Sequence, residues 1–570
     1  MTLLNSVTQR THIAYFSMEI ALRPEIHTYS GGLGVLAGDT ARSCADLELR
    51  AVFVTLVNKA GYFRQKIAPD GRQLEEPDWW DPAQFCTPLN AMVAVEMEGR
   101  PVWIRSWLYV HRFEHGHEIP ILLLDTDFEQ NGKDDRTLTH FLYAGDEAYR
   151  LKQEIVLGIG GLRMLRALGF EIHTYHLNEG HAAFLTLELL NRYRIPQEER
   201  EPGTPPYDTT LVHERCVFTT HTPVEAGHDQ FSYELFERVM PDFVIASELK
   251  RLAGPDKLNM TRLAFNLSGY INGVARRHAE TTEHQFPGYH IHAITNGIHV
   301  GTWAHESFAK LFDERLPRWL HEPETLVRAL QLDENEIWQC HRAAKADLFG
   351  LIENSTGVSF DPAVLTVGFA RRMTGYKRPL LLFSDLDWLT ALAARHPFQI
   401  VMAGKAHPQD DEGKRTIERL HQIAHELEGK VQCVFLPGYE MGLAKTLIAG
   451  SDIWLNTPLA PMEASGTSGM KAALNGVLNL SILDGWWVEA CIDGVNGWAI
   501  STGAEASTDG VDAALLYEKL GSTVLPLYYG QTGRWRWMMK HAIGTIAYYF
   551  NSQRMMRRYA TEAYLPHLMT

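Results

Sequence analysis

The chain has 570 residues, of which 45% are hydrophobic and 21% charged. This composition is that of an ordinary folded protein and excludes long disorder, and at about 150 residues per domain it predicts two to four domains. The 53 Lys and Arg against 69 Asp and Glu give a net charge of −16, which disfavours nucleic acid or an anionic membrane surface as a partner.

The sequence also indicates the compartment in which the protein works. No stretch approaches the ~18 consecutive apolar residues that a membrane helix needs. The N-terminal residues lack the basic start and apolar stretch of a signal peptide. The six cysteines are scattered without Cys-x-x-Cys spacing, so we expect neither a disulfide framework nor a structural zinc site. We therefore expect a cytoplasmic protein without membrane contact.

The first half of the chain combines strands with a glycine loop. A short apolar run is followed by Ser30-Gly31-Gly32-Leu33-Gly34 and by a helix-like stretch that starts near Val35. A second helical stretch covers 150–168. The apolar runs of strand length expected here are 12–16, 51–57, 102–110, 119–124, 173–178 and 215–220.

The second half alternates strands with helices. The apolar runs of strand length are 364–369, 398–403, 431–436, 453–456 and 476–480. The helix-length stretches between them include 378–395, 412–428 and 440–449. This alternation predicts a parallel sheet covered on both faces, which binds ligands in the loops that follow the strands. The polar clusters lie in those loops, at 370–377, 404–407 and 457–471.

We place the boundary between two α/β domains after residue 295. The N-terminal domain is then 1–295 and the C-terminal domain 296–534. The tail, 535–570, has helical spacing with basic and aromatic residues and shows no further strand. We expect this tail to pack back on the first domain.

The most informative segment is Glu463-Ala464-Ser465-Gly466-Thr467-Ser468-Gly469-Met470-Lys471. Small residues at a strand-to-helix junction expose backbone N–H groups, which favours binding an anion near Ser465, Gly466 and Thr467. A lysine just inside the following helix can carry a cofactor as a Schiff base when burial or nearby cations keep its amine neutral. On these residues alone, the alternative is a Gly/Ser-rich turn with a solvated lysine.

A second segment gathers cations on this acidic protein. Arg371, Arg372, Lys377 and Arg378 follow a buried strand within eight positions. A solvated helix start is one interpretation. The place after a central strand favours oxyanion binding instead, because arginine offers a rigid fork and lysine a point charge.

The run 463–490 closely resembles the pyridoxal-phosphate segment of α-glucan (glycogen, starch or maltodextrin) phosphorylases, and it is most similar to the shorter bacterial and archaeal branch. In that family the lysine that matches Lys471 forms the imine with pyridoxal 5'-phosphate. Further matches occur in family order at 30–34, 150–154, 176–181, 219–223, 295–298 with Trp303, 371–378, 404–406 and 437–439. The resemblance implies a GT-B fold, in which two Rossmann-like domains face a central cleft and C-terminal helices pack back on the first domain.

The resemblance also implies roles for the matched residues. The residues expected to be catalytic are Lys471, Arg372, Lys377, His221 and Glu463. The residues expected to hold the cofactor are Lys471, Thr467, Gly466, Gly32, Arg371 and Tyr439. The residues expected to bind the substrate are Gly31, Leu33, Asn296, Tyr376, Ser465 and Gly466. Arg372 and Lys377 hold the substrate phosphate in this scheme, and Arg371 stands where the long-chain branch commonly has a lysine.

The activity that the resemblance implies is phosphorolysis of an α-1,4-glucan or maltodextrin. A terminal glucosyl unit passes to inorganic phosphate and leaves as α-D-glucose 1-phosphate with retention. In this family the cofactor phosphate relays a proton through the substrate phosphate to the departing oxygen, so a pair of catalytic carboxylates is not required. Family members are commonly dimeric, which makes a homo-oligomer an expectation. Long-chain relatives carry arginine where Glu440 stands, so we expect this corner to be reorganised.

Two other functions compete with this interpretation. A nucleotide-sugar glucosyltransferase of the glycogen-synthase type would share the architecture, but such enzymes often carry a second glutamate eight positions after the first. Here Glu463 is followed at that spacing by Lys471. A glucan-binding relative with impaired catalysis is disfavoured because the expected catalytic residues are retained together. We expect no metal site, since paired histidines such as His176 and His181 lack the helix pattern and glutamate base of zinc proteases.

Overall fold

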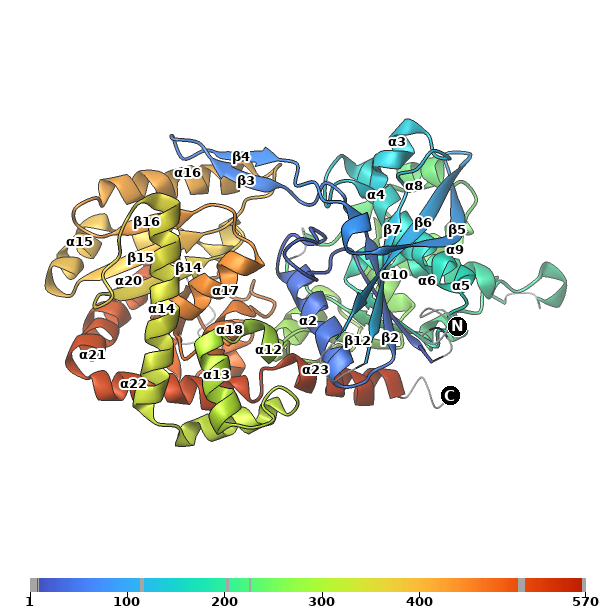
Figure 1. The fold of residues 1–570 in the computed structure, drawn as a ribbon. Coiled ribbons are helices and arrows are strands. Elements are labelled where there is room, and N and C mark those ends of the chain that lie inside the picture. Colours follow the sequence, from blue (N-terminus) through green and yellow to red (C-terminus); the bar gives the residue numbers. More distant parts are fainter. Residues whose placement is uncertain are drawn as a thin grey trace.

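The computed structural model describes residues 8, 10–112, 117–200, 204–224, 227–500 and 508–565. Two lobes, each built around one large β-sheet, lie side by side (Figure 1). The strands of the first sheet lie between Ile13 and Ala293, and those of the second between Leu365 and Ala499. The boundary after residue 295 remains a prediction. Across the described residues, no helix has both the length and the apolar character needed to cross a membrane.

The first sheet is parallel over most of its width and antiparallel at one edge. In spatial order its strands are β13 (His292–Ala293), β12 (Tyr270–Gly273), β9 (Cys216–Thr219), β8 (Thr174–Asn178), β1 (Ile13–Ser17), β2 (Ala51–Leu56), β7 (Ile119–Asp125), β6 (Arg100–His111) and β5 (Thr87–Met97). The pairs from β13 to β7 are parallel, whereas β6 pairs antiparallel with β7 and β5. Every residue of β1, β2, β7 and β8 is buried, which explains their continuous apolar runs. All six expected strands are present, and β5, β12 and β13 are additional.

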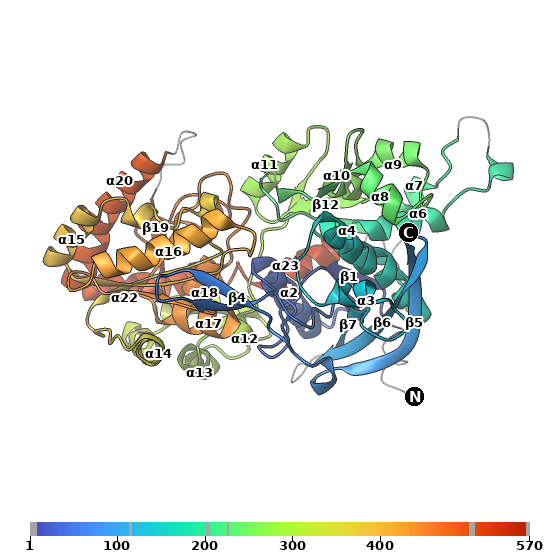
Figure 2. The ribbon, with the colours of Figure 1, turned by 90° about the horizontal axis from the view of Figure 1, so that it is seen from above.

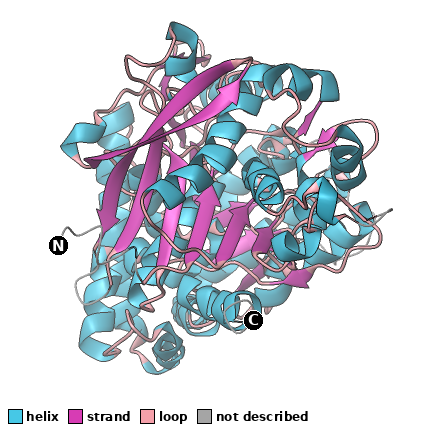
Figure 3. Cartoon of the chain, turned by 90° about the vertical axis from the view of Figure 1, so that its right-hand side faces the viewer, coloured by secondary structure: helices cyan, strands magenta, loops and turns pink. Residues whose placement is uncertain are grey.

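Helices lie on both sides of this twisted sheet (Figure 3). They are α2 (Gly32–Asp46), α3 (Lys133–Arg136), α4 (Glu147–Ile155), α5 (Gly161–Ala167), α6 (Phe184–Arg192), α7 (Thr209–His213), α8 (Tyr233–Val239), α9 (Ala246–Ala253), α10 (Met260–Asn266) and α11 (Arg276–Gln285). A π-helical turn at Val156–Gly160 joins α4 to α5, so the helix expected over 150–168 is confirmed with one irregularity. The first helix begins at Gly32, inside the glycine loop, rather than near Val35.

The second sheet is parallel throughout. In spatial order its strands are β16 (Cys433–Leu436), β15 (Phe398–Ala403), β14 (Leu365–Ala370), β17 (Ile453–Asn456), β18 (Leu478–Ser481) and β19 (Gly497–Ala499). The five expected strands are present, and β19 is an addition at the edge. Because the strands are parallel, the polar loops after β14, β15 and β17 emerge at the same carboxyl edge.

The helices of the second lobe confirm most of the predicted pattern. They are α12 (Val300–Trp303), α13 (Glu306–Arg315), α14 (Glu334–Thr356), α15 (Leu386–Arg395), α16 (Asp411–Glu426), α17 (Met441–Gly450), α18 (Ser468–Leu474), α19 (Trp487–Ala490), α20 (Asp509–Lys519), α21 (Leu525–Gly530) and α22 (Thr532–Ala542). The prediction of one helix over 378–395 is wrong. Arg378 has φ +47° and precedes Pro379, and one short 3-10 turn, Leu381–Phe383, separates it from α15. A left-handed residue before proline does not continue a helix.

The C-terminal tail returns to the first lobe (Figure 1). After α22, which packs in the second lobe, α23 (Ser552–Arg558) lies against α2. The hydroxyls of Ser552 and Ser43 are 2.7 Å apart, and Tyr564 OH lies 2.6 Å from Nδ1 of His176 on β8. The expected packing of the tail on the first domain is therefore confirmed from α23 onward, whereas residues 535–550 of the expected tail pack in the second lobe. Residues 566–570 of the tail lie outside the described residues.

A small hairpin also connects the lobes. The strands β3 (Arg64–Ile67) and β4 (Gln73–Glu76) pair antiparallel and reach from the first lobe over the second, beside α16 (Figures 1 and 2). A Cβ on Gly71, at the hairpin turn, would lie only 2.8 Å from Cβ of His421 on α16. The lobes are thus held together by the hairpin in addition to the tail.

Candidate active site

The lysine of the glycine-rich segment lies inside the protein. Lys471 is on α18 and only 6% exposed. Its Nζ lies 3.6 Å from the centre of the Trp303 ring, and no described residue accepts a hydrogen bond from it. Burial lowers the pKa of this amine from 10.5 to about 8, and the charge of Asp39 opposes the shift. A buried amine that is partly neutral near pH 7 is suited to attack on an aldehyde.

The first lobe fixes the ring beneath this lysine. Trp303 Nε1 donates to Asp39 Oδ2 at 2.8 Å. Asp39 also accepts from the backbone N–H of His299 at 3.2 Å and from Arg42 at 3.3 Å. The sequence marks Trp303 only as a family landmark, and it does not single out Asp39, because no local motif surrounds this residue. The contact exists only where α2 meets α12.

The loop after β14 holds one arginine inside and leaves another outside. Arg371 is buried, and its Nη2 donates to the carbonyl of Leu455 at 2.8 Å. Burial lowers the pKa of Arg371 to about 10, so the guanidinium stays charged near neutral pH. Arg372 is exposed, and its side chain makes no hydrogen bond or ion pair with the described residues. Its guanidinium is therefore available to an anion.

Arg378, the last cation of the loop, has a structural role instead. Its Nη2 lies 2.6 Å from Asp512 Oδ2 and donates to the carbonyl of Pro458 at 2.8 Å. The guanidinium is buried and already neutralised. The loop therefore offers three cations to a ligand rather than the four suggested by the sequence.

Lys377 joins the basic loop to the glycine-rich segment. Its Nζ lies 2.5 Å from Oε2 of Glu463, and both side chains are largely buried. Burial lowers the pKa of Lys377, but the charge of Glu463, the neighbouring Tyr376 and the hydrogen bond to Glu463 together outweigh burial, so the pKa is raised overall. The backbone N–H of Glu463 donates to Asp484 Oδ2 at 2.8 Å, and burial raises the pKa of Asp484 to about 7. Arg371 Nη1 donates to the backbone carbonyl of Lys377 at 3.4 Å, so Arg371, Lys377 and Glu463 form one group, called the loop cluster below.

Several buried polar atoms have no partner among the described residues. They include Ser465 Oγ, Arg371 Nε, Thr374 Oγ1 and Asn296 Oδ1. Gly466, with φ +85°, and Thr467 follow Ser465 and are half-buried. Because buried polar groups are nearly always hydrogen-bonded, unpaired ones mark a place for ligand or water. The amine of Lys471 suits an aldehyde, and Ser465 Oγ, Thr374 Oγ1 and Arg371 Nε can donate to a phosphate, so these residues fit an aldehyde that carries a phosphate.

The N-terminal glycine loop wraps a carboxylate of its own lobe. Glu19 Oε2 accepts from the backbone N–H groups of Ser30 at 2.6 Å and Gly31 at 3.1 Å. A Cβ on Gly34 would lie 2.6 Å from the same oxygen, so the close approach requires glycine. At Gly31 and Gly32 a Cβ would meet open space. This side of the loop is therefore free to approach a ligand.

His221 is held by Asn178 and Glu179, and within the described residues neither His221 nor Asn296 is bonded to the loop cluster. His221 Nε2 donates to Asn178 Oδ1 at 2.6 Å, and its backbone N–H donates to Glu179 at 2.7 Å. Burial lowers the pKa of His221 to about 4, so its ring is neutral near pH 7. In the described part of the chain, no hydrogen bond or ion pair joins the side chain of His221 or of Asn296 to the loop cluster.

The expected site residues differ in exposure. The buried ones are Arg371, Asn296, Glu463, Ser465 and Lys471. The half-buried ones are Gly31, Leu33, His221, Tyr376, Lys377, Tyr439, Gly466 and Thr467. The exposed ones are Gly32 and Arg372. No group of three or more His, Cys, Asp or Glu side chains among the described residues could hold a metal ion.

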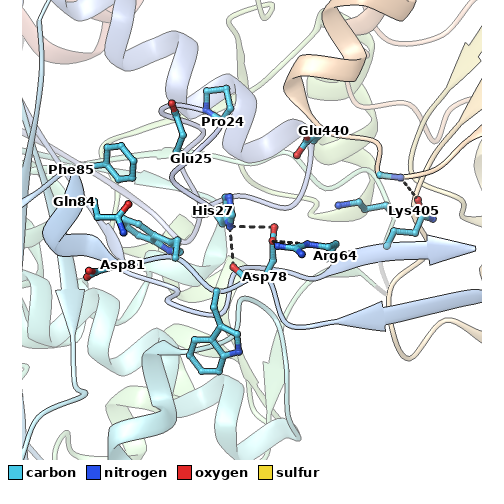
Figure 4. A pocket seen from close by; sticks show the side chains of 14 residues that line it. Pro24, Glu25, His27, Arg64, Asp78, Asp81, Gln84, Phe85, Lys405 and Glu440 are labelled. Atoms are coloured by element: carbon cyan, nitrogen blue, oxygen red, sulfur yellow. Dashed lines mark hydrogen bonds and ion pairs between the residues drawn. The ribbon is translucent and has the colours of Figure 1, made fainter. Parts of the chain in front are cut away.

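Glu440 has surroundings of a different kind. It is exposed and lines a cavity of about 890 Å³ between the lobes (Figure 4). The first lobe contributes His27, Arg64 and Asp78, and the Asp78 carboxylate lies 3.2 Å from His27 and 3.0 Å from Arg64. The described residues that line this cavity do not include Lys471 or the loop cluster. Glu440 therefore borders the inter-lobe cavity beside the site.

Comparison with known proteins shows which family this two-lobed chain is similar to. The family model for carbohydrate phosphorylases matches residues 246–497. A maltodextrin phosphorylase of Thermococcus litoralis is 37% identical over 97% of this chain and 70% of its own. Glycogen phosphorylases of Mycobacterium tuberculosis and Aquifex aeolicus are 37% and 33% identical over 98% of this chain, and over 71% and 86% of theirs.

Two α/β lobes, one with a sheet that is parallel throughout and one with a sheet that is parallel over most of its width, have the GT-B fold of the glycosyltransferases that this family model describes. The chain belongs to the carbohydrate phosphorylase family.

Proposed function

We infer that this chain is an α-glucan phosphorylase. It transfers the terminal glucosyl unit of an α-1,4-glucan, such as maltodextrin, to inorganic phosphate and releases α-D-glucose 1-phosphate with retention. The observation that carries this inference is the buried, partly neutral amine of Lys471 in a family member whose basic loop joins the same glycine-rich segment through Lys377 and Glu463. Relatives named as maltodextrin and glycogen phosphorylases, aligned over nearly the whole chain, support it.

Carbohydrate phosphorylases generally use pyridoxal 5'-phosphate, and we propose that Lys471 holds it here. The lysine has no acceptor or anion bound to its amine among the described residues, which leaves the amine available. The residues proposed to hold the cofactor are Lys471, Thr467, Gly466, Gly32, Arg371 and Tyr439. When bound, the cofactor supplies a phosphate that can exchange a proton with the substrate phosphate.

Arg372 and Lys377 are proposed to bind the substrate phosphate. The guanidinium of Arg372 has no hydrogen-bond or ion-pair partner among the described residues, and its planar N–H donors suit two oxygens of one phosphate. Lys377 offers a point charge whose place is set by Glu463, 2.5 Å away. Two phosphates side by side repel each other, so the reaction requires cations at this position.

The remaining residues are proposed to orient the glucosyl unit. Glu463, Ser465, Gly466 and Tyr376 would contact the ring hydroxyls, and His221 and Asn296 the 6-hydroxyl side. Because Asn178 Oδ1 accepts from Nε2 of His221, the neutral ring keeps Nδ1 as an acceptor for a sugar hydroxyl. Contacts that hold the sugar near the phosphate lower the entropic part of the barrier.

Phosphate-dependent release of glucose 1-phosphate from maltodextrin tests the proposed function. Glucosyl transfer from a nucleotide sugar without phosphate dependence would favour the synthase-type enzyme, and glucan binding without product would favour a non-catalytic relative. Lys471→Ala should abolish both the cofactor absorbance and the product. Lys445→Ala is the matched control, because Lys445 Nζ also faces the Trp303 ring, at 5.9 Å, and the absorbance should persist. A homo-oligomer is a separate proposal, tested by light scattering.

A further inference from the structure

The β3–β4 hairpin presents a polar face to the second lobe. Gln65 and Gln73 are each 5% exposed, whereas Lys66 and Leu74, which alternate with them, are exposed. A hairpin that only filled space would bury apolar side chains. Buried amides instead require partners of defined geometry.

Both glutamines bind the backbone of loops in the second lobe. Gln65 Nε2 donates to Gly404 O at 2.8 Å and to Gln73 Oε1 at 2.9 Å, and Gln65 Oε1 accepts from Gly438 N–H at 2.8 Å. Gln73 Nε2 donates to the carbonyl of Ala406, and Gln73 Oε1 accepts from the backbone N–H of Ala406, both at 3.0 Å. One amide, that of Gln65, therefore bridges the loops after β15 and β16.

Those two loops lie directly behind proposed site residues. The backbone N–H of Met373, next to Arg372, donates to the carbonyl of Lys405 at 3.0 Å. Gly438, which adopts φ +71°, immediately precedes Tyr439. The hairpin thus contacts the support of the basic loop and the peptide that carries the tyrosine.

We propose that Gln65 is a positioning residue for phosphorolysis, holding these two loops so that Arg372 and Tyr439 stand where phosphate and cofactor are bound. This inference rests on the proposed function of the site. Because the glutamine comes from the first lobe and the loops from the second, the same contact couples the arrangement of the lobes to the arrangement of the site.

The inter-lobe cavity explains why loss of this contact should loosen the loops without unfolding the lobe. Gln65, Gly438 and Lys405 all line the cavity of about 890 Å³. Figure 4 shows Lys405 and Glu440 of the second lobe facing Arg64 at the root of the hairpin. Water can therefore replace broken hydrogen bonds, while Lys405 Nζ still donates to the first lobe.

The test compares Gln65→Met, which keeps the shape and removes the hydrogen bonds, with Lys66→Met on the outer face of the same strand. Among the described residues, the side chain of Lys66 makes only an exposed ion pair, with Glu76 at 2.7 Å. Hydrogen exchange of a peptide spanning 436–441 reports on the loop directly. For Gln65→Met we expect this exchange to be about tenfold faster and the KM for phosphate to rise about fivefold, more than kcat falls. Lys66→Met should match the wild type in both.

A Gln65→Met variant that matches Lys66→Met in exchange and in KM would overturn the proposal. If Gln65→Met does not fold, Gln65→Glu decides. Its carboxylate still accepts from Gly438 but cannot donate to Gly404, so the loop stays protected while the KM for phosphate rises; an unchanged KM would overturn the proposal. Failure of the proposed function is distinguishable, because the wild type would then bind no cofactor and form no product.

Discussion

The amine of Lys471 lies 3.6 Å from the centre of the Trp303 ring, and the indole N–H of Trp303 donates to Asp39 at 2.8 Å. The lysine is on α18 of the second lobe and the aspartate on α2 of the first. The ring face and the carboxylate both favour a charged amine, yet burial outweighs them and lowers the pKa of Lys471 to about 8. Both lobes therefore set the protonation of this amine.

This relationship predicts how the apoprotein captures pyridoxal 5'-phosphate as pH changes. The neutral amine is the nucleophile, so the capture rate should rise with pH and level off above about 8, rather than near the ordinary pKa of 10.5. Asp39→Asn removes a charge that raises the pKa of Lys471, so its profile should shift to lower pH. Absorbance of the bound cofactor follows both. Asp46→Asn, at the end of the same helix, is the control, and a shift of equal size there would contradict the role of Asp39.

Arg372→Ala should weaken phosphate use more than glucan use. Removing a charged hydrogen-bond donor costs roughly 1.5–3 kcal/mol, so we expect the KM for phosphate to rise by about 10- to 100-fold while the KM for maltodextrin changes little. Initial rates with each substrate varied in turn measure this. Arg395→Ala, an exposed arginine at the end of α15, should leave both constants unchanged. Equal loss of both substrates with Arg372→Ala would contradict the assignment.

The sequence predicts the second sheet well because its strands are short and nearly all of their residues are buried. Each of β14, β15 and β17 appears as one apolar run followed by a polar loop, so both the strand and the site loop can be placed. The β3–β4 hairpin was not predicted because its buried face carries Gln65 and Gln73, and periodicity in apolar residues does not detect a polar face. The helix predicted from Arg378 fails for a local reason, a positive φ before Pro379.

The residues of the candidate site can likewise be predicted from the sequence only in part. Lys471, Arg371 and Glu463 lie in contiguous motifs, and their local sequence is enough to single them out. Asp484 lies inside the matched run 463–490, yet no pattern there marks its carboxylate as the acceptor of the Glu463 N–H. Asp39 carries no motif at all and acts through Trp303, far along the chain and on another element. Such partners depend on how the lobes pack, which one sequence does not specify.

The Lys377–Glu463 pair predicts that each partner destabilises the protein when left alone. Removing one member of a largely buried ion pair leaves an uncompensated charge, at a cost of about 3 kcal/mol, whereas removing both costs less than the sum. We expect Lys377→Met and Glu463→Gln each to lower Tm, and the double variant to lower it less than additively. The more exposed pair Lys540–Glu334, 2.9 Å apart, is the control and should show little coupling. Additive losses at Lys377 and Glu463 would contradict an ion pair of this strength.

Asp484 predicts a pH dependence of stability. Burial raises its pKa from 3.8 to about 7, so between these values the unfolded chain is ionised while the folded protein keeps the proton. The folded state therefore loses stability as pH rises from about 4 to 7, by roughly 2–3 kcal/mol between pH 5 and 7, and the loss stays constant above that range.

The Asp484→Asn variant cannot ionise at this position, so its stability relative to the wild type should increase between pH 5 and pH 8. The carboxylate accepts from the backbone N–H groups of Glu463 and Gly485, and the amide can accept from only one of them. This loss is the same at both pH values. Thermal unfolding of both proteins at the two pH values measures this. Asp387→Asn, an exposed change on α15, should show the same Tm difference at both. A gap between wild type and Asp484→Asn that is independent of pH, or that moves in the opposite direction, would show that the carboxylate titrates near its ordinary pKa in the folded protein.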